Sequence, residues 1–305
     1  MCSLLRRVAE ERGTQVVLTT HSRHVVDAIG SSCGFLWIRN GEVDKARPED
    51  EVGILLDIGA LDVKERVGQA GSEVIVLTED EIFKPIEVIL SSSGFDMSKT
   101  LILPYYGVTA TEHLRPLVNV IKGVSNRAII VVHRDRDFLL PNEVQAWETS
   151  VRAIGVEPFV TEARDLESSF INAAFLAEKN SELNKEEFEI LIDETLKEKQ
   201  TELVSDYVNG RVDIVRKGED RANLNYGNLA VEAAKQVEKN ARIYAGKAIL
   251  RSLRGSFQTK TKQNLRVYEQ SAKLKSSSAA LIAAKAFRSH QSTSHPKTVG
   301  GAVPH

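Results

Sequence analysis

Apolar runs of strand length alternate with stretches of helical spacing along residues 73–171, and this alternation is the clearest structural signal in the chain. Strand-like runs stand at 74–78, 100–103, 128–133 and 156–160. Segments with apolar residues three or four positions apart stand at 82–90, 109–122 and 141–154. Strands and helices that alternate at these lengths predict βαβ units, so we expect an α/β fold with a parallel sheet flanked by helices.

The first 66 residues carry a weaker pattern. Leu4, Leu5 and Val8 form a helical stripe that Gly13 ends. We expect a short buried strand at 15–18, a helix that includes 25–29, and a strand at 35–38 with its hairpin turn at 39–42. These elements precede the main alternation and predict a separate domain.

Beyond residue 170 the pattern becomes helical. The clearest helical segments are 170–177, 188–201 and 230–253. Ser, Ala, His, Thr and Pro accumulate from Ser276 onward, a composition that buries little apolar surface. We therefore divide the chain into segments 1–66, 70–175, 176–275 and 276–305, and we expect the last one to be largely disordered.

Composition excludes several classes of protein. A hydrophobic content of 42% in 305 residues is ordinary for a globular chain. Cys2 and Cys33 form neither a disulfide framework nor a zinc-binding pattern, which fits a reducing cytoplasm. No apolar run approaches the roughly 20 residues that cross a bilayer, and the charged N-terminus is unlike a signal peptide. We expect a cytoplasmic protein with no membrane association.

The formal net charge of −2 hides an uneven distribution. Residues 245–297 contain eleven Lys or Arg and a single acid, Glu269, so the remainder of the chain is acidic. A basic block on an acidic protein is typical of binding to a polyanion such as nucleic acid. The alternative is a solvated basic surface without a partner.

Two of the expected strands end in carboxylates. Glu79 follows the run 74–78, and Asp135 and Asp137 follow the run 128–133. Ligands bind at the carboxyl ends of parallel strands, and carboxylates that meet there favour a hard cation. The sequence thus predicts a Mg²⁺ site suited to phosphoryl transfer. The alternative is structural, because acidic residues also cap the helices that follow.

This arrangement resembles a known family. A strand followed by Glu and a later strand followed by Asp-x-Asp, on a βαβαβ frame, is similar to the Toprim domain of topoisomerases, primases and OLD-type (overcoming lysogenization defect) nucleases. The resemblance implies that Glu79, Asp135 and Asp137 hold the catalytic Mg²⁺ or Mn²⁺. Where the family usually has Gly and then a further acid, this chain has Asp80 and Phe83. Phe83 cannot bind a second ion.

Two later segments extend the resemblance to OLD-type nucleases. The stretch around Glu167 resembles their acidic helix start, which implies that Glu167 is a ligand of a second metal ion. The alternative is a first-turn glutamate that stabilises a helix dipole. Ala245-Gly246-Lys247 resembles the segment that supplies a late lysine, which implies that Lys247 stabilises charge on the scissile phosphate. For His133 and Arg134 the alternatives are contact with phosphate and, as is common for polar residues at a strand end, contact with water.

The N-terminus resembles another part of the same architecture. Residues 16–22 are similar to the switch-histidine segment of ABC-type ATPases, which implies that His21 contacts the γ-phosphate of ATP. No Walker A motif G-x-x-x-x-G-K-[ST] is present in the chain. Residues 1–66 are therefore expected to be the last part of an ABC-type ATPase domain. ATP would bind only if a partner chain supplied the Walker motifs.

The resulting hypothesis is a Toprim-like, metal-dependent DNA endonuclease of OLD type, in DNA processing or defence against phage. Its partners would be DNA and an ATPase chain or further copies of itself. The residues expected to contact the DNA backbone are Arg251, Arg254, Lys260, Lys262 and Arg266. The alternatives are RNA cleavage or primer synthesis, and a non-catalytic DNA-binding or ATPase-partner subunit with a degenerate site.

Overall fold

The computed structural model describes two compact units within the chain. One unit comprises residues 1–71 and 112–127, and the other comprises residues 72–111 and 128–305. The described residues are 2–19, 34, 37–39, 42–44, 63, 66–105, 111–217 and 226–288.

The described residues of the first unit include a helix, a hairpin, a helical stretch at 66–70 and a further helix. Among these are α1 (Cys2–Arg12), the antiparallel pair β1 (Trp37–Arg39) and β2 (Glu42–Asp44), and most of α5 (Thr111–Val124). The expected N-terminal helix and hairpin are confirmed. The expected buried strand at 15–18 is wrong, because these residues form no strand and Val17 is 80% exposed.

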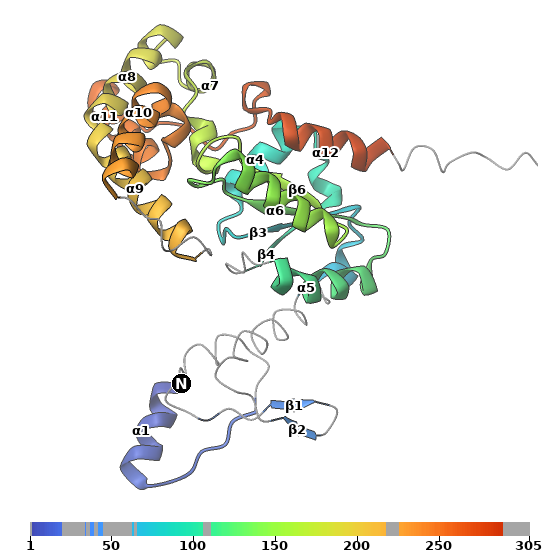
Figure 1. Cartoon of the computed structure of the whole chain (residues 1–305). Helices are drawn as coiled ribbons and strands as arrows, with labels where there is room; N and C mark the ends of the chain where they lie inside the picture. Colours follow the sequence, from blue (N-terminus) through green and yellow to red (C-terminus); the bar gives the residue numbers. More distant parts are fainter. Residues whose placement is uncertain are drawn as a thin grey trace, which may run out of the picture. The chain divides into compact units, whose positions relative to one another are not determined.

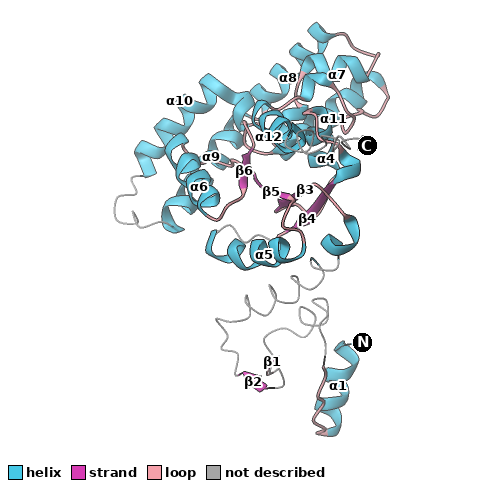
Figure 2. Ribbon diagram, turned by 90° about the vertical axis from the view of Figure 1, so that its right-hand side faces the viewer, coloured by secondary structure: helices cyan, strands magenta, loops and turns pink. Residues whose placement is uncertain are grey.

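The second unit is built on a four-stranded, all-parallel sheet. Its strands are β3 (Val74–Thr78), β4 (Thr100–Pro104), β5 (Ile129–Arg134) and β6 (Glu157–Val160). The spatial order is β4-β3-β5-β6, and Figure 2 shows the strands in this sequence. Val74 is in register with Thr100 on one side and with Ile129 on the other. The expected α/β fold is confirmed, and its topology is Rossmann-like.

Helices flank the sheet. The expected helices near it are α4 (Lys84–Ser92) and α6 (Pro141–Ala153), each with a proline in its first turn. A proline there sacrifices no helical hydrogen bond, because the first N–H groups of a helix have no partner. The spacing assigned Ile82 to the first of these helices, but α4 begins only at Lys84. Ile82 precedes the helix and is 74% exposed. Figure 2 shows α4 and the C-terminal helix α12 (Ser277–Arg288) on one side of the sheet.

The remaining helices gather beside the sheet, as Figure 1 shows. They include three short 3₁₀ turns, of which η4 lies close to the strand ends. Their bounds are η3 (Met97–Lys99), η4 (Leu166–Phe170), α7 (Ala173–Lys179), α8 (Lys185–Glu198), α9 (Gln200–Lys217), α10 (Tyr226–Tyr244), α11 (Lys247–Thr261) and η6 (Ala272–Leu274). The helical character expected beyond residue 170 is confirmed.

The expected single helix over 230–253 is wrong, because the chain breaks between α10 and α11. Ala245 and Gly246 separate the two helices, and Gly246 is the extended N-cap of α11. A Cβ atom at position 246 would overlap the carboxylate of Asp165. Glycine is therefore required by the close approach of that carboxylate and not by an unusual backbone angle.

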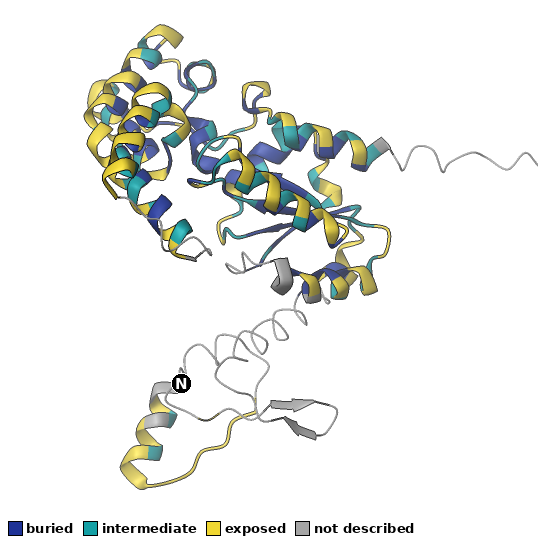
Figure 3. Cartoon of the chain, in the orientation of Figure 1, coloured by how far each residue is buried: buried dark blue, intermediate teal, exposed yellow. Residues whose placement is uncertain are grey.

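One hydrophobic core connects the sheet with the helices. Val76 and Val131 of the sheet belong to the same buried cluster as Phe188 of α8 and Phe257 of α11. The rings of Phe188 and Phe257 are stacked with their centroids 5.6 Å apart. Figure 3 shows the buried residues concentrated in the sheet and on the inner sides of the helices. Residues on both sides of position 175 thus fold as one body.

Helix α12 corrects the expectation of a disordered tail from residue 276. Ala279, Ala283 and Ala286 are buried, and the ring of Phe287 packs edge-on against Phe95 at 6.2 Å. Small alanine side chains allow the helix to approach the body closely, so a composition poor in large apolar residues still buries a helix. Residues 289–305 lie outside the described part. Among the described residues, no helix has the length and apolar character needed to span a bilayer.

Candidate active site

Acidic side chains from two neighbouring strand ends meet at one edge of the sheet. Glu79 follows β3 and Asp135 follows β5, and these strands are paired. Glu79 Oε1 accepts a hydrogen bond from the backbone N–H of Asp135 at 3.0 Å. The charges of Asp80 and Asp165 act on Asp135, and both also act on Glu167. We call the set of five the acidic edge: Glu79, Asp80, Asp135, Asp165 and Glu167.

Among the residues of the acidic edge that the sequence predicted, Asp135 is the most buried. It is 7% exposed, and its Oδ1 accepts the backbone N–H of Leu166 at 3.1 Å. Burial raises the pKa of this carboxyl to about 9, and the charges of Asp80, Asp165 and Glu79 act in the same direction. Without a cation, Asp135 is therefore protonated at neutral pH.

Asp165 joins the strand ends to the helical region, and the sequence did not identify it as a site residue. Its Oδ1 accepts the N–H and the hydroxyl of Ser168 at 2.9 and 2.8 Å, which caps η4. Its Oδ2 accepts the backbone N–H of Lys247 at 3.1 Å. The available signal was the Asp-x-x-Ser spacing, which is typical of a helix cap. That signal says nothing of the contact with α11.

Lys247 brings a cation to the acidic edge from the first turn of α11. Its Nζ lies 3.5 Å from Asp80 Oδ1 and 3.7 Å from Glu167 Oε1. Burial disfavours the ammonium form, but the carboxylates of Glu167, Asp80 and Asp135 together outweigh it and raise the pKa of Lys247. The structure thus brings Lys247 close to Asp80 and Glu167.

The other three expected metal ligands, Glu79, Glu167 and Asp137, differ in their surroundings. Burial raises the pKa of Glu79, against the hydrogen bond from Asp135, while the charge of Asp137 adds to the rise. Burial also raises the pKa of Glu167, and Lys247 opposes this. Asp137 is exposed and adopts a left-handed backbone conformation with φ of 52°, which aspartate tolerates better than most residues. It therefore borders the acidic edge from the solvent side.

His133 differs from both alternatives, because it is buried and does not meet solvent. Its exposed fraction is 0%, and burial lowers the pKa of the imidazole to about 3, so the ring is neutral. Nδ1 lies 2.9 Å from Thr78 Oγ1, and the ring packs against Phe159 with centroids 5.1 Å apart. Nε2 lies 3.8 Å from Asp135 Oδ1.

The expected DNA-contacting residues are all exposed, but they do not form one surface. Lys247, Arg251 and Arg254 stand at positions i, i+4 and i+7 of α11 and share one face of the helix. At about 100° per residue, Lys260 falls on the opposite side. Lys262 ends the helix, and Arg266 forms an ion pair with Glu269 at 2.8 Å. The basic stripe that begins at the acidic edge therefore consists of Lys247, Arg251 and Arg254.

The acidic edge has the donor atoms of a magnesium or manganese site, all of them carboxylate oxygens. Among the residues that the structure describes, no three His, Cys, Asp or Glu side chains converge in a geometry that could hold a metal ion. One carboxylate oxygen each of Glu79, Asp135 and Asp165 accepts a backbone N–H group. A cation would have to replace part of this hydrogen bonding.

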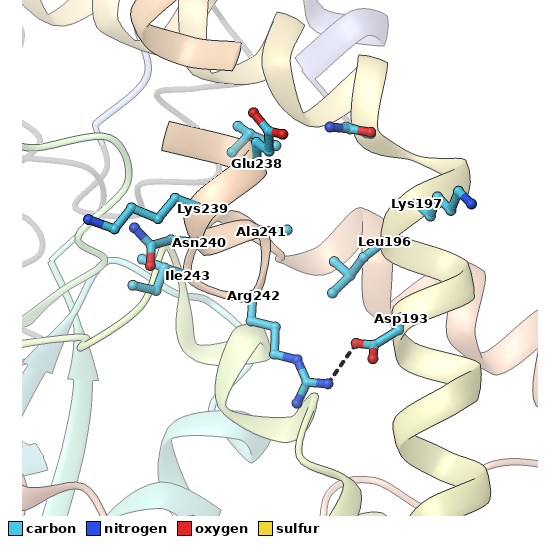
Figure 4. A pocket seen from close by; sticks show the side chains of 11 residues that line it. Asp193, Leu196, Lys197, Glu238, Lys239, Asn240, Ala241, Arg242 and Ile243 are labelled. Atoms are coloured by element: carbon cyan, nitrogen blue, oxygen red, sulfur yellow. Dashed lines mark hydrogen bonds and ion pairs between the residues drawn. The ribbon is translucent and has the colours of Figure 1, made fainter. Parts of the chain in front are cut away.

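A groove of about 500 Å³ lies between α8 and α10 and includes none of the acidic edge. Figure 4 shows Arg242 on its wall, paired with Asp193 at 2.7 Å. Arg242 also pairs with Glu189 at 2.5 Å. Arg242 is thus paired with two carboxylates, and we assign the groove no ligand.

His21 lies outside the described residues, so the expected ATP contact has no structural counterpart here. The sequence matches no family model, and comparisons with curated proteins and with solved structures find no match either. The function of the chain must therefore be inferred from the acidic edge and its surroundings.

Proposed function

We propose that the protein is a metal-dependent DNA endonuclease of Toprim type, related to the OLD nucleases, and that its active site is the acidic edge. The observation that carries this proposal is the contact of Glu79 with Asp135 at two paired strand ends, with Lys247 beside them. Five carboxylates and one lysine at the mouth of a parallel sheet suit the binding of a cation and a phosphodiester.

The cation would be Mg²⁺ or Mn²⁺, held by Glu79, Asp135 and Asp137, with Glu167 or Asp80 available to a second ion. The ion would supply Lewis acidity and a bound water of lowered pKa. Asp135 must lose its proton when the cation binds, because its raised pKa belongs to the metal-free state. Lys247 would then stabilise negative charge that develops on the scissile phosphate.

DNA would run along α11 from the acidic edge. Arg251 and Arg254 continue the face of Lys247, so their guanidinium groups are placed to contact successive backbone phosphates. Arg254 also lies over the ring of Tyr268, 5.1 Å from its centroid, which holds the side chain against the surface. Contacts to phosphate alone give binding that depends on salt and little on base sequence.

The decisive experiment is a plasmid-nicking assay on the full chain with Mg²⁺, Mn²⁺ or EDTA. We expect nicking with either metal, none with EDTA, and a fall to background in Asp135→Asn, which keeps the shape of the side chain. The matched control is Asp213→Asn, an exposed residue of α9, which should cleave like the unchanged protein. Cleavage that survives Asp135→Asn would overturn the assignment of the site.

A second candidate is a DNA-binding subunit without catalytic activity. The observation that favours it is the ammonium of Lys247, which already supplies a positive charge to Asp80 and Glu167. In that case DNA binding would persist in EDTA, and no metal would produce nicks. Either candidate is compatible with a partner chain that supplies the ATP-binding motifs, and either is compatible with assembly into oligomers of the chain itself.

A further inference from the structure

The imidazole of His133 has one satisfied nitrogen and one unsatisfied nitrogen. Nδ1 lies 2.9 Å from the hydroxyl oxygen of Thr78, whereas Nε2 has no hydrogen-bond partner in the described part of the chain. Nε2 lies 3.8 Å from Asp135 Oδ1. Buried polar atoms without a partner are uncommon in folded proteins, so this nitrogen requires an explanation.

The hydroxyl of Thr78 determines which nitrogen of His133 carries the proton. The Thr78 oxygen accepts the backbone N–H of Asp80 at 3.3 Å. Within the described residues, His133 Nδ1 is the partner that can accept the hydroxyl proton, and donation there leaves no hydrogen-bonding group of Thr78 unsatisfied. A neutral imidazole that accepts at Nδ1 carries its own proton on Nε2, on the side that faces Asp135.

Hydrogen bonds from Tyr105 also fix the backbone at His133 and at Thr78. The hydroxyl of Tyr105 donates to the carbonyl of His133 at 3.1 Å, and the N–H of Tyr105 donates to the carbonyl of Thr78 at 2.8 Å. Tyr105 therefore ties the end of β3 to β5 at the level of the ring. A ring fixed in this way offers its Nε2–H in one direction.

We propose that His133 is the positioning residue of Asp135, and that Asp80, Thr78, His133 and Asp135 form a hydrogen-bond relay between the two acidic strand ends. The separation of 3.8 Å exceeds a hydrogen bond of ~2.7–3.2 Å, so the relay closes when the Asp135 carboxylate turns toward the ring. Donation by His133 orients the ionised carboxylate and leaves its other oxygen for a cation. Only this last consequence depends on the proposed function.

The first test needs no substitution. Nitrogen-15 NMR of the metal-free full chain, recorded above pH 9 where the Asp135 carboxylate is ionised and can only accept, distinguishes the two neutral tautomers, because protonated and unprotonated ring nitrogens resonate far apart. We expect His133 to carry its proton on Nε2 and to have an unprotonated Nδ1. A proton on Nδ1 would overturn the relay, whatever the protein does with metals or DNA.

The second test uses two substitutions of similar size and polarity. His133→Gln places an amide nitrogen near the position of Nε2, whereas His133→Asn reaches only the position of Nδ1. Loss of a group that orients a metal ligand typically weakens metal binding by about 10- to 100-fold. We expect that loss of Mn²⁺ affinity in His133→Asn and recovery of most of it in His133→Gln, as measured by electron paramagnetic resonance.

The outcomes separate the relay from the proposed function. Equal Mn²⁺ affinities in both variants, with the fold of each verified by circular dichroism, would contradict a positioning role. If the unchanged protein bound no Mn²⁺ at all, the proposed function would fail. The tautomer of His133 would still confirm or overturn the relay in that case.

Discussion

Glu79 and Asp135 are 56 positions apart in the sequence, and the side chain of the first accepts the backbone N–H of the second at 3.0 Å. This bond holds together the ends of two paired strands. It also uses an oxygen of Glu79 that a cation would otherwise take. The contact therefore stabilises the arrangement of the acidic edge when no metal is bound.

The first prediction concerns the pH dependence of stability in EDTA. The pKa of Asp135 rises from 3.8 to about 9 on folding, so the folded state binds this proton more tightly than the unfolded state. The contribution of Asp135 to stability is then largest at low pH and falls as the pH rises from 3.8 toward 9. From about pH 5 to pH 8 we expect Asp135→Asn to lose less stability than the unchanged protein, by on the order of 4 kcal/mol, since each pH unit contributes about 1.4 kcal/mol.

Urea denaturation of both proteins at each pH measures this difference. The pKa values of Glu79 and Glu167 are also raised in the folded state, so these two residues also make stability fall with rising pH. Their contribution remains in the variant. Parallel dependences of stability on pH in the two proteins would show that Asp135 is ionised in the metal-free fold.

The second prediction is that Mn²⁺ stabilises the unchanged protein against heat at about pH 8 and does not stabilise Asp135→Asn. A cation that binds only the folded state adds about 2.7 kcal/mol at one hundred times its dissociation constant. Differential scanning calorimetry at several metal concentrations measures the effect. Equal stabilisation of Asp135→Asn would place the metal elsewhere.

The third prediction separates the role of Lys247 from metal binding. Lys247→Gln removes the ammonium near Asp80 and Glu167 but no carboxylate. We expect DNA cleavage to fall by about 10²- to 10³-fold, as when one stabilising group is removed from a developing charge. Mn²⁺ affinity should hold or rise, since a competing cation is gone. A parallel loss of metal affinity would contradict the assigned role.

The fourth prediction concerns the basic stripe of α11. Arg251→Gln with Arg254→Gln should reduce the slope of log affinity against log salt by about 1.8, or about 0.9 for each lost phosphate contact. Fluorescence anisotropy of labelled duplex DNA measures that slope. Lys260→Gln is the control, because Lys260 lies on the opposite side of the same helix. An equal effect of Lys260→Gln would remove the preference for one face.

The fifth prediction concerns packing between α9 and the loop after β5. A Cβ atom at Gly210 would overlap the ring of Phe138, so Gly210→Ala should destabilise the fold by about 1–3 kcal/mol. A Cβ atom at Gly255 of α11 would meet no other atom within 4 Å, and Gly255→Ala should stabilise the fold by about 0.5–1 kcal/mol. Thermal unfolding of the two variants gives the comparison, and equal signs would contradict it.

Local patterns in the sequence were sufficient to predict the sheet. The four strands appear within a residue or two of their expected positions, because parallel strands covered on both faces are continuously apolar. Glu79 and Asp135 could be expected to lie together for the same reason, since the carboxyl ends of neighbouring parallel strands share one edge.

Contacts between distant segments could not be predicted in this way. The role of Asp165 depends on the backbone of Lys247, 82 positions later, and no local spacing encodes that contact. The same contact requires Gly246, where helical periodicity alone had predicted a continuous helix. His133 was expected to contact phosphate or water because it is polar and near a strand end, but tertiary packing against Phe159 buries it.

The late position of Lys247 in the sequence has a consequence for synthesis of the chain. Synthesis runs from the N-terminus, so the four strands and their carboxylates leave the ribosome well before Lys247 does. The core that the sheet shares with α11 closes only when that helix is present, because a domain folds as a unit. During the interval the nascent chain carries the acidic strand ends without the positive charge of Lys247, and protons or divalent ions from the surrounding solution would offset their charge.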